Sequence, residues 1–265
     1  MDGEGTAEAV IDLPADRETG LRVGRVVLFG PTGSGKTLMA CALARQMAPP
    51  SFEEVYVLSP VATAANNLPN AKWFQISPQD KKKTEAFMAE VKDKRALVLI
   101  DEADAYFGGS ARTFGTPSMA DAVLFGRNAC LSMILIAHGT SLSPKSLIEN
   151  AAGVFFFRTT TPGLLDWAED YAAEDIPDVA HTLRNLPNHV ALIYAPMSAN
   201  RFVGFGKLDL ATGQISIWTP DIRTDDDEEQ GQISEGVLPE ESRQDSPADA
   251  GVLNPTPGTN QGGKP

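Results

Sequence analysis

The chain has 265 residues, 22 lysines and arginines against 35 aspartates and glutamates, and a formal net charge of -13. This length predicts one or at most two domains, and the acidic balance excludes a globally basic nucleic-acid binder. The acids are unevenly placed, because residues 1–20 carry six acids and one base and residues 221–265 carry eleven acids and three bases. Residues 21–220 are left with no net charge, so a polyanionic partner requires a local basic site.

Composition divides the chain into three parts. Residues 1–20 and 221–265 are acidic, poor in apolar periodicity and predicted to be disordered, and residues 21–220 are predicted to form the folded domain. Cys41 and Cys130 lie far apart without metal-ligand spacing, which predicts two buried thiols in a reducing compartment. The acidic N-terminus is unlike a signal peptide and no apolar run approaches about 18 residues, so we expect a cytoplasmic protein without a transmembrane segment.

Short apolar runs alternate with helical patterns through the folded part. Strands are predicted over residues 25–29, 54–58, 96–100, 131–137, 153–157 and 190–194, and helices over 36–47, 80–92, 118–128 and 164–173. Strands that are apolar throughout are typical of a parallel sheet covered on both faces. Apolar runs at 202–205, 207–210 and 214–218, with a turn at 211–213, predict an antiparallel hairpin at the sheet edge. The fold class is α/β, with a mostly parallel central sheet and a C-terminal β-hairpin.

The strongest motif follows the first predicted strand and matches G-x-x-x-x-G-K-[ST]. Its residues are Gly30, Pro31, Thr32, Gly33, Ser34, Gly35, Lys36 and Thr37. Glycines at these positions let successive N–H groups surround a phosphate chain at the start of a helix. The motif predicts that Lys36 reaches the β- and γ-phosphates of ATP and that Thr37 ligates Mg²⁺.

A second motif places two acids directly after the buried strand 96–100. At the carboxyl end of a parallel strand, Asp101 and Glu102 face the same crevice as the phosphates. We expect Asp101 to hold Mg²⁺ and Glu102 to polarise the attacking water. Together the motifs predict a RecA-like P-loop NTPase of the additional-strand, catalytic-glutamate type, with ATP hydrolysis as its activity. Asp104 completes the letters of a helicase DEAD box, but the chain has no room for a second RecA-like domain, and we interpret Asp104 as a helix or turn acid.

Two further residues are candidates for catalysis. His138 follows the strand 131–137 and is the candidate sensor of the γ-phosphate, against the alternative of a histidine that only ends a strand. Arg127 ends the preceding helix and is the candidate arginine finger acting on a neighbouring subunit, against the alternative of a helix C-terminal arginine. Arg112, in a glycine-rich loop, is the alternate finger. His181 and His189 are interpreted as surface or packing residues.

The order of these motifs resembles that of the FtsK/HerA superfamily. The resemblance covers about residues 23–195 and includes the segment 141–150 and the strand 153–158. The chain is most similar to compact viral genome-packaging ATPases and to the ATPase domain of zona-occludens-toxin-like phage assembly proteins. The resemblance implies a homo-oligomeric ring that pumps double-stranded DNA by ATP hydrolysis, with a capsid portal or membrane-vertex protein as a further partner and the virion as a possible location. His138 stands where that family usually has glutamine.

Double-stranded DNA would need cations on the folded part. The densest group of bases comprises Lys81, Lys82, Lys83, Lys92, Lys94 and Arg95. Such residues give salt-sensitive affinity for phosphates, but acids interleave with them and a solvated face is the alternative. Trp73 and Phe74 are interpreted as strand core rather than as base-stacking residues. Two other functions stay open, an ATPase of phage assembly or secretion and a nucleotide switch or kinase.

Overall fold

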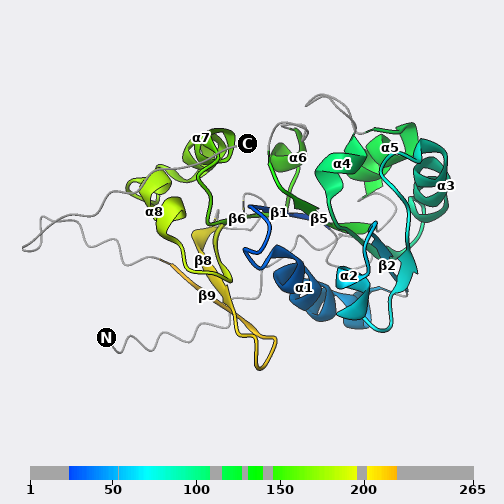
Figure 1. Ribbon diagram of the computed structural model, residues 1–265, viewed down its shortest axis with the longest axis horizontal. Helices are drawn as coiled ribbons and strands as arrows, with labels where there is room; N and C mark the ends of the chain where they lie inside the picture. Colours follow the sequence, from blue (N-terminus) through cyan, green and yellow to red (C-terminus); the bar gives the residue numbers. More distant parts are fainter. Residues whose placement is uncertain are drawn as a thin grey trace, which may run out of the picture. The chain divides into compact units, whose positions relative to one another are not determined.

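Nine strands form one sheet in the part of the chain that the structure, a computed structural model, describes: residues 24–52, 54–107, 115–126, 131–139, 146–195 and 202–219. The strands are β1 (Arg25–Phe29), β2 (Glu54–Leu58), β3 (Lys72–Phe74), β4 (Ala96–Ile100), β5 (Ser132–Ala137), β6 (Gly153–Phe157), β7 (Val190–Ala195), β8 (Phe202–Leu208) and β9 (Ile215–Trp218). Their order across the sheet is β3-β2-β4-β5-β1-β6-β7-β8-β9 (Figure 1).

The sheet has a parallel and an antiparallel part. The strands from β3 to β6 in this order pair in parallel, and the pairs β6–β7, β7–β8 and β8–β9 are antiparallel. Strand β5 lies between β1 and β4, with Ile134 opposite both Val26 and Leu99. The carboxyl ends of β1, β5 and β4 therefore meet at one edge of the sheet, where α/β folds bind their ligands.

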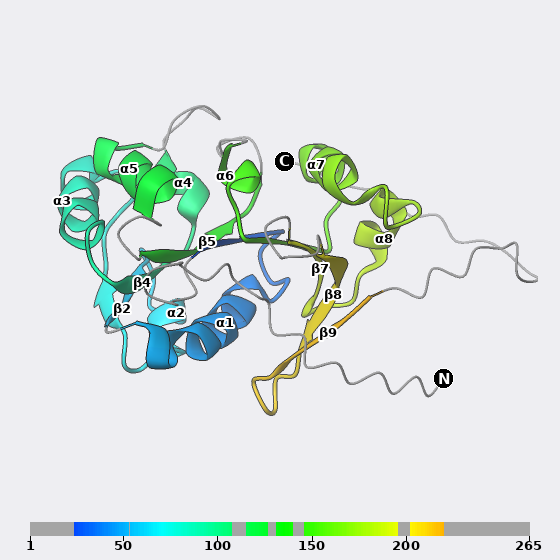
Figure 2. The same ribbon diagram turned by 180° about the vertical axis from the view of Figure 1, so that it is seen from behind.

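Helices cover both faces of the sheet (Figures 1 and 2). The helices are α1 (Lys36–Ser51), α2 (Thr63–Asn66), α3 (Lys81–Val91), α4 (Ala103–Phe107), α5 (Pro117–Phe125), α6 (Ser146–Glu149), α7 (Pro162–Ala172) and α8 (Val179–Asn185). Helices α1 and α2 pack on one face, and the buried residues of α3 to α8 form the core on the other. None of the described helices is long and apolar enough to cross a membrane.

The alternation of side chains along the strands builds two cores from one sheet. In β1, Val27 and Phe29 join the core beneath α3 to α8, whereas Val26 and Leu28 join the core beneath α1. Strands β1, β4, β5 and β6 are buried at every position. Apolar residues at successive positions are what a strand covered on both faces requires, and this requirement explains why the sequence lacks a polar alternation there.

The predicted α/β fold with a mostly parallel sheet and C-terminal antiparallel strands is confirmed. The six apolar strands predicted between residues 25 and 194 are all present, within one residue of the expected bounds. The last of them, β7, runs antiparallel to its neighbours. Strand β8 is one continuous strand through Gly206 rather than two short ones, and β9 pairs with it as the edge hairpin. Helices α2, α4, α6 and α8 have four to seven residues and were not predicted, since so short a segment shows no clear helical period.

Several sequence predictions fall outside the described residues. These are the two acidic ends, 1–20 and 221–265, and the residues Arg112, Arg127 and Cys130. The other cysteine, Cys41, is buried in α1 with its Sγ 3.6 Å from the carbonyl oxygen of Ala64, and burial raises the pKa of its thiol to about 12. Cys41 is therefore a packing thiol, as predicted.

Candidate active site

The phosphate-loop motif connects the carboxyl end of β1 to the first turn of α1. Gly33 and Gly35 have φ angles of 81° and 100°, a left-handed backbone that side-chain-bearing residues rarely adopt. The amide of Gly30 donates to the carbonyl oxygen of Ala137 at 3.3 Å, which ties the start of the loop to the end of β5. The loop is thus held at the edge of the sheet where β1 and β5 end.

Lys36 begins α1 and is only 4% exposed. Its Nζ donates to the carbonyl oxygen of Pro31 at 2.7 Å, so the ammonium spans the loop. Burial lowers the pKa of Lys36 from 10.5 to about 8, and the charges of Asp101 and Asp104 oppose this shift. The side chain therefore still carries its charge at neutral pH, at the place where a phosphate would bind.

The two acids of the second motif follow β4 directly. Asp101 is 6% exposed, its amide donates to the carbonyl oxygen of Leu58 at 3.0 Å, and burial together with the charge of Glu102 raises its pKa. Glu102 has a φ of 57°, and its amide donates to Oδ1 of Asp101 at 3.2 Å. A glutamate held in the left-handed region is unfavourable by about 1–2 kcal/mol. Such backbone strain concentrates at active sites.

Asp104 belongs to this site, which the sequence analysis missed. It lies in the first turn of α4, as predicted for a helix acid, but its Oδ2 accepts a hydrogen bond from the amide of His138 at 3.1 Å. The side chain therefore links the helix that follows Asp101 and Glu102 to the tip of β5. The contact joins α4 to the end of β5 through a backbone amide, so no local sequence pattern indicates it.

His189 is the second residue whose position the sequence did not indicate. It directly precedes β7, its amide donates to the carbonyl oxygen of Ser34 at 3.2 Å, and its ring packs on Gly35. The prediction of a packing residue holds, but the surface that it packs against is the phosphate loop itself. The contact joins segments more than 150 residues apart, so no local pattern could have revealed it.

Three buried polar atoms without a hydrogen-bond partner lie in or beside the phosphate loop. They are Ser34 Oγ, Asp104 Oδ1 and His189 Nδ1; other such atoms in the described residues, such as Thr84 Oγ1, lie elsewhere. Buried polar groups are normally paired, and a polar ligand is one explanation for unpaired ones. Ser34 lies in the phosphate loop, and the other two residues flank it.

The donor set fits a nucleotide with Mg²⁺ rather than a metal held by protein alone. No group of three or more His, Cys, Asp or Glu side chains suited to a metal exists among the described residues. Mg²⁺ bound with a nucleotide needs only one or two protein oxygens, the rest coming from phosphates and water. Thr37, half-buried in the first turn of α1, and the buried carboxylate of Asp101 are the residues that could supply them.

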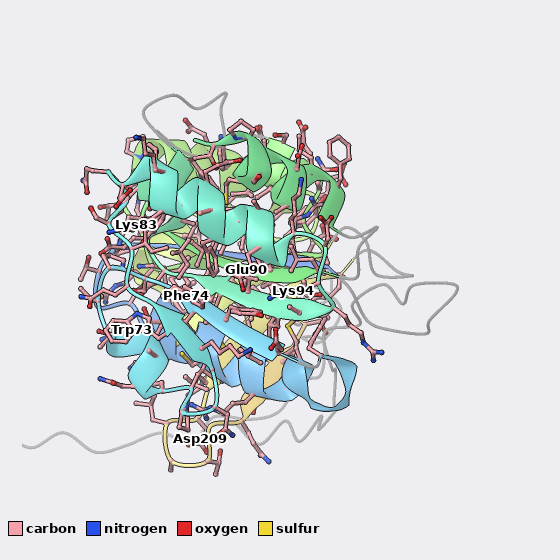
Figure 3. The ribbon with its side chains drawn as sticks, turned by 90° about the vertical axis from the view of Figure 1, so that its right-hand side faces the viewer. Trp73, Phe74, Lys83, Glu90, Lys94 and Asp209 are labelled. Atoms are coloured by element: carbon pink, nitrogen blue, oxygen red, sulfur yellow. The ribbon has the colours of Figure 1, made fainter. Side chains whose placement is uncertain are left out.

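The predicted basic group is divided in the structure. Figure 3 shows Lys83 near the start of α3 and Lys94 beyond its far end. Lys83 pairs with Asp80, Lys92 with Asp121, and Lys94 with Glu90, while Lys81 donates to the carbonyl oxygen of Tyr106. Three of the six bases are thus paired with acids, and a role for this group in DNA binding stays a prediction.

The interpretation of Trp73 as strand core is wrong. Trp73 lies on the edge strand β3, is 39% exposed, and donates from Nε1 to the carbonyl oxygen of Ser59 at 3.3 Å (Figure 3). Phe74, the next residue, packs against the rings of Tyr56 and Phe87, as expected for a core residue. An edge strand has no neighbour to cover its outward side chains, and this explains the difference.

Comparison with known proteins agrees with this site and fold. Residues 26–127 match the family described as ATPase family associated with various cellular activities (AAA). This range contains the phosphate loop, Asp101 and Glu102. The match over this range and the order of the strands in the sheet together define a P-loop ATPase domain.

Solved viral proteins have a similar fold. The genome packaging NTPase B204 from Sulfolobus turreted icosahedral virus 2, in complex with sulfate, is 19% identical with a TM-score of 0.53, covering 75% of this chain and 97% of that one. The same protein in complex with ATP-gammaS gives 20% identity, a TM-score of 0.51 and coverages of 75% and 98%. B204, the DNA-packaging ATPase from Sulfolobus turreted icosahedral virus, is 18% identical with a TM-score of 0.53, and the match covers 74% of this chain and 97% of that one. The resemblance to viral packaging ATPases is thereby confirmed at the level of the fold, and no curated protein sequence matches the chain.

Proposed function

We propose that the protein hydrolyses ATP and uses the energy to translocate double-stranded DNA, packaging a viral genome as a homo-oligomeric ring. The observation that carries the proposal is the placement of the phosphate loop and the acid pair at one edge of the sheet, with β5 between their strands. The likeness to viral packaging NTPases over three quarters of the chain supports the same function.

Each residue of the site has a role in hydrolysis. Backbone N–H groups of the phosphate loop and the ammonium of Lys36 bind the phosphates, for which Lys36 must leave the carbonyl of Pro31. Thr37 and Asp101 would hold Mg²⁺, which would neutralise phosphate charge when bound. Glu102 orients the attacking water and accepts its proton. His138 senses the γ-phosphate.

Asp104 acts through His138. The hydrogen bond from the His138 amide to Asp104 Oδ2 fixes the tip of β5 relative to α4, so the sensor and the acid pair keep one geometry. The unpaired Oδ1 of Asp104 lies close enough to Lys36 for its charge to raise the pKa of that lysine. Asp104 is therefore a positioning residue for both the sensor and the lysine.

Two substitutions test hydrolysis. Lys36→Ala should abolish nucleotide binding or turnover, and Glu102→Gln should block turnover by at least about a hundredfold while ATP still binds. Glu169→Gln, at an exposed acid of α7, is the matched control and should leave turnover unchanged. Phosphate release and binding of a fluorescent ATP analogue measure the two steps. Unchanged turnover in both site variants would contradict the proposed chemistry.

The DNA part of the proposal has its own test. ATP turnover is measured with and without double-stranded DNA at two salt concentrations, and we expect stimulation that weakens as salt rises, because phosphate contacts release counterions. An ATPase of assembly or secretion, or a nucleotide switch or kinase, predicts no stimulation. A result without stimulation at either salt concentration would reject translocation while leaving hydrolysis intact.

In the proposed ring, a neighbouring subunit would supply an arginine to the site, for which Arg127 is the candidate and Arg112 the alternate. Subunits carrying Arg127→Ala keep their own Glu102, and subunits carrying Glu102→Gln keep their own Arg127. If the arginine acts across the interface, mixtures of the two inactive variants should regain turnover. No recovery at any mixing ratio would reject Arg127 as the finger.

A further inference from the structure

His189 lies between the phosphate loop and the antiparallel part of the sheet. Its φ of 63° is in the left-handed region, which is unfavourable for a histidine and persists only where the surroundings hold it. Its amide donates to the carbonyl oxygen of Ser34 at 3.2 Å, and its own carbonyl oxygen accepts from the amide of Leu208 at 3.0 Å. One residue is therefore hydrogen-bonded to both the phosphate loop and β8.

The ring of His189 packs directly on Gly35. A Cβ placed on Gly35 would lie 2.4 Å from His189 Nδ1, so the ring fills the space that a side chain at this position would need. Nδ1 is buried and has no hydrogen-bond partner among the described residues. Gly35 immediately precedes Lys36, so the ring covers the last residue of the loop before α1.

These contacts restrict the last part of the phosphate loop, Ser34 and Gly35. A phosphate loop presents its N–H groups to the ligand, which leaves carbonyl groups on its outer side. Ser34 is 6% exposed, and its carbonyl would be a buried unpaired acceptor without the amide of His189. Glycine 35 has no side chain to limit its rotation, and the ring restricts the space in which it can rotate.

We propose that His189 is a positioning residue of the phosphate loop, holding the Ser34–Gly35 peptide in its binding conformation and coupling it to β8. The effect on nucleotide affinity rests on the proposed function, whereas the effect on the loop itself does not. Without the ring, the loop samples more conformations and binds phosphate with a larger entropy loss. The hydrogen bond from the amide of residue 189 to the carbonyl oxygen of Ser34 can form in every variant at this position except proline.

The test compares three variants of the full-length protein. His189→Gly removes the ring and relieves the left-handed backbone, so the protein should fold with a thermal midpoint within about 4 °C of the original. His189→Asn keeps a polar atom close to the place of Nδ1 and tolerates the left-handed region. His181→Ala, at an exposed histidine of α8, is the matched control.

Hydrogen exchange in the nucleotide-free protein is the first measurement. Peptides covering residues 32–37 should exchange at least about fivefold faster in His189→Gly, with His189→Asn close to the original and His181→Ala unchanged. The Kd of a fluorescent ADP analogue should rise about fivefold to tenfold in His189→Gly, because the freer loop loses more conformational entropy on binding. Normal loop exchange in a folded His189→Gly protein would overturn the proposal. Faster loop exchange in a protein that proves unable to hydrolyse ATP would uphold it and reject the proposed function instead.

Discussion

Replacing Lys36 by methionine should stabilise the nucleotide-free protein, although it removes the residue proposed to bind phosphate. Lys36 is 4% exposed and its ammonium donates a hydrogen bond to the carbonyl oxygen of Pro31, so its charge is held largely away from water. Methionine is similar in length and carries no charge to desolvate. The carbonyl of Pro31, on an exposed residue, can take a hydrogen bond from water in its place.

The size of the effect follows from the pKa of Lys36. A fall from 10.5 to about 8, at about 1.4 kcal/mol for each pKa unit, means that the charged side chain destabilises the fold by about 3 kcal/mol at pH 7. The unfolded chain binds the proton more tightly than the folded one, so this destabilisation is complete below pH 8 and disappears as the pH rises to 10.5. At pH 9.5 about 1.4 kcal/mol remains by the same relation.

Urea unfolding of the original protein and of Lys36→Met at pH 7 and pH 9.5 measures this difference. The variant should be more stable at pH 7, and its advantage should shrink by about half at pH 9.5. ADP with Mg²⁺ at about a thousand times its Kd should reverse the order, because such a ligand stabilises the original by about 4.1 kcal/mol. A variant less stable at pH 7, or an advantage independent of pH, would refute the assignment of a desolvated charge to Lys36.

Three other substitutions have defined outcomes. Glu102→Gly should end ATP hydrolysis yet raise the free energy of unfolding by about 1 kcal/mol, since glycine accepts the φ of 57°. If urea unfolding showed Glu102→Gly to be no more stable than Glu102→Gln, backbone strain at residue 102 would be contradicted. Gly35→Ala should destabilise the fold by about 1–3 kcal/mol through backbone strain and its contact with His189. The loss of stability should be larger than in Gly33→Ala, where a Cβ meets nothing within 4 Å. Equal melting temperatures of the two variants would argue against the contact. Asp104→Ala should lower kcat about tenfold by unpairing the His138 amide, whereas Asp104→Asn, which keeps an acceptor, should retain most activity in phosphate-release assays.

The sequence was most informative where chemistry and local structure coincide. The phosphate loop needs glycines at fixed positions between a strand and a helix, so Gly33, Gly35 and Lys36 could be placed from their spacing alone. Asp101 and Glu102 could be placed because a buried strand that ends in acids must present them at its carboxyl edge. The parallel strands were found for a similar reason, since two covered faces demand continuous apolar residues.

The remaining part of the site depends on contacts between distant segments. The amide of His138 reaches Asp104, and the amide of His189 reaches the carbonyl of Ser34. Both contacts use backbone N–H groups, which every residue except proline carries, so the sequence holds no mark of them. Trp73 was misplaced because nothing in its own segment indicates that β3 is an edge strand.

The two edges of the sheet limit how copies of this chain can associate. Strand β3, at one edge, has three residues, and Lys72 at its start pairs with Glu54; strand β9, at the other edge, has four. Short edge strands and a lysine on the edge are features that disfavour pairing with a strand from another molecule. A sheet continuous between neighbouring copies is therefore disfavoured, and we expect subunits of a ring to meet through helices and loops, which can slide or rotate against one another without breaking a hydrogen-bonded ladder.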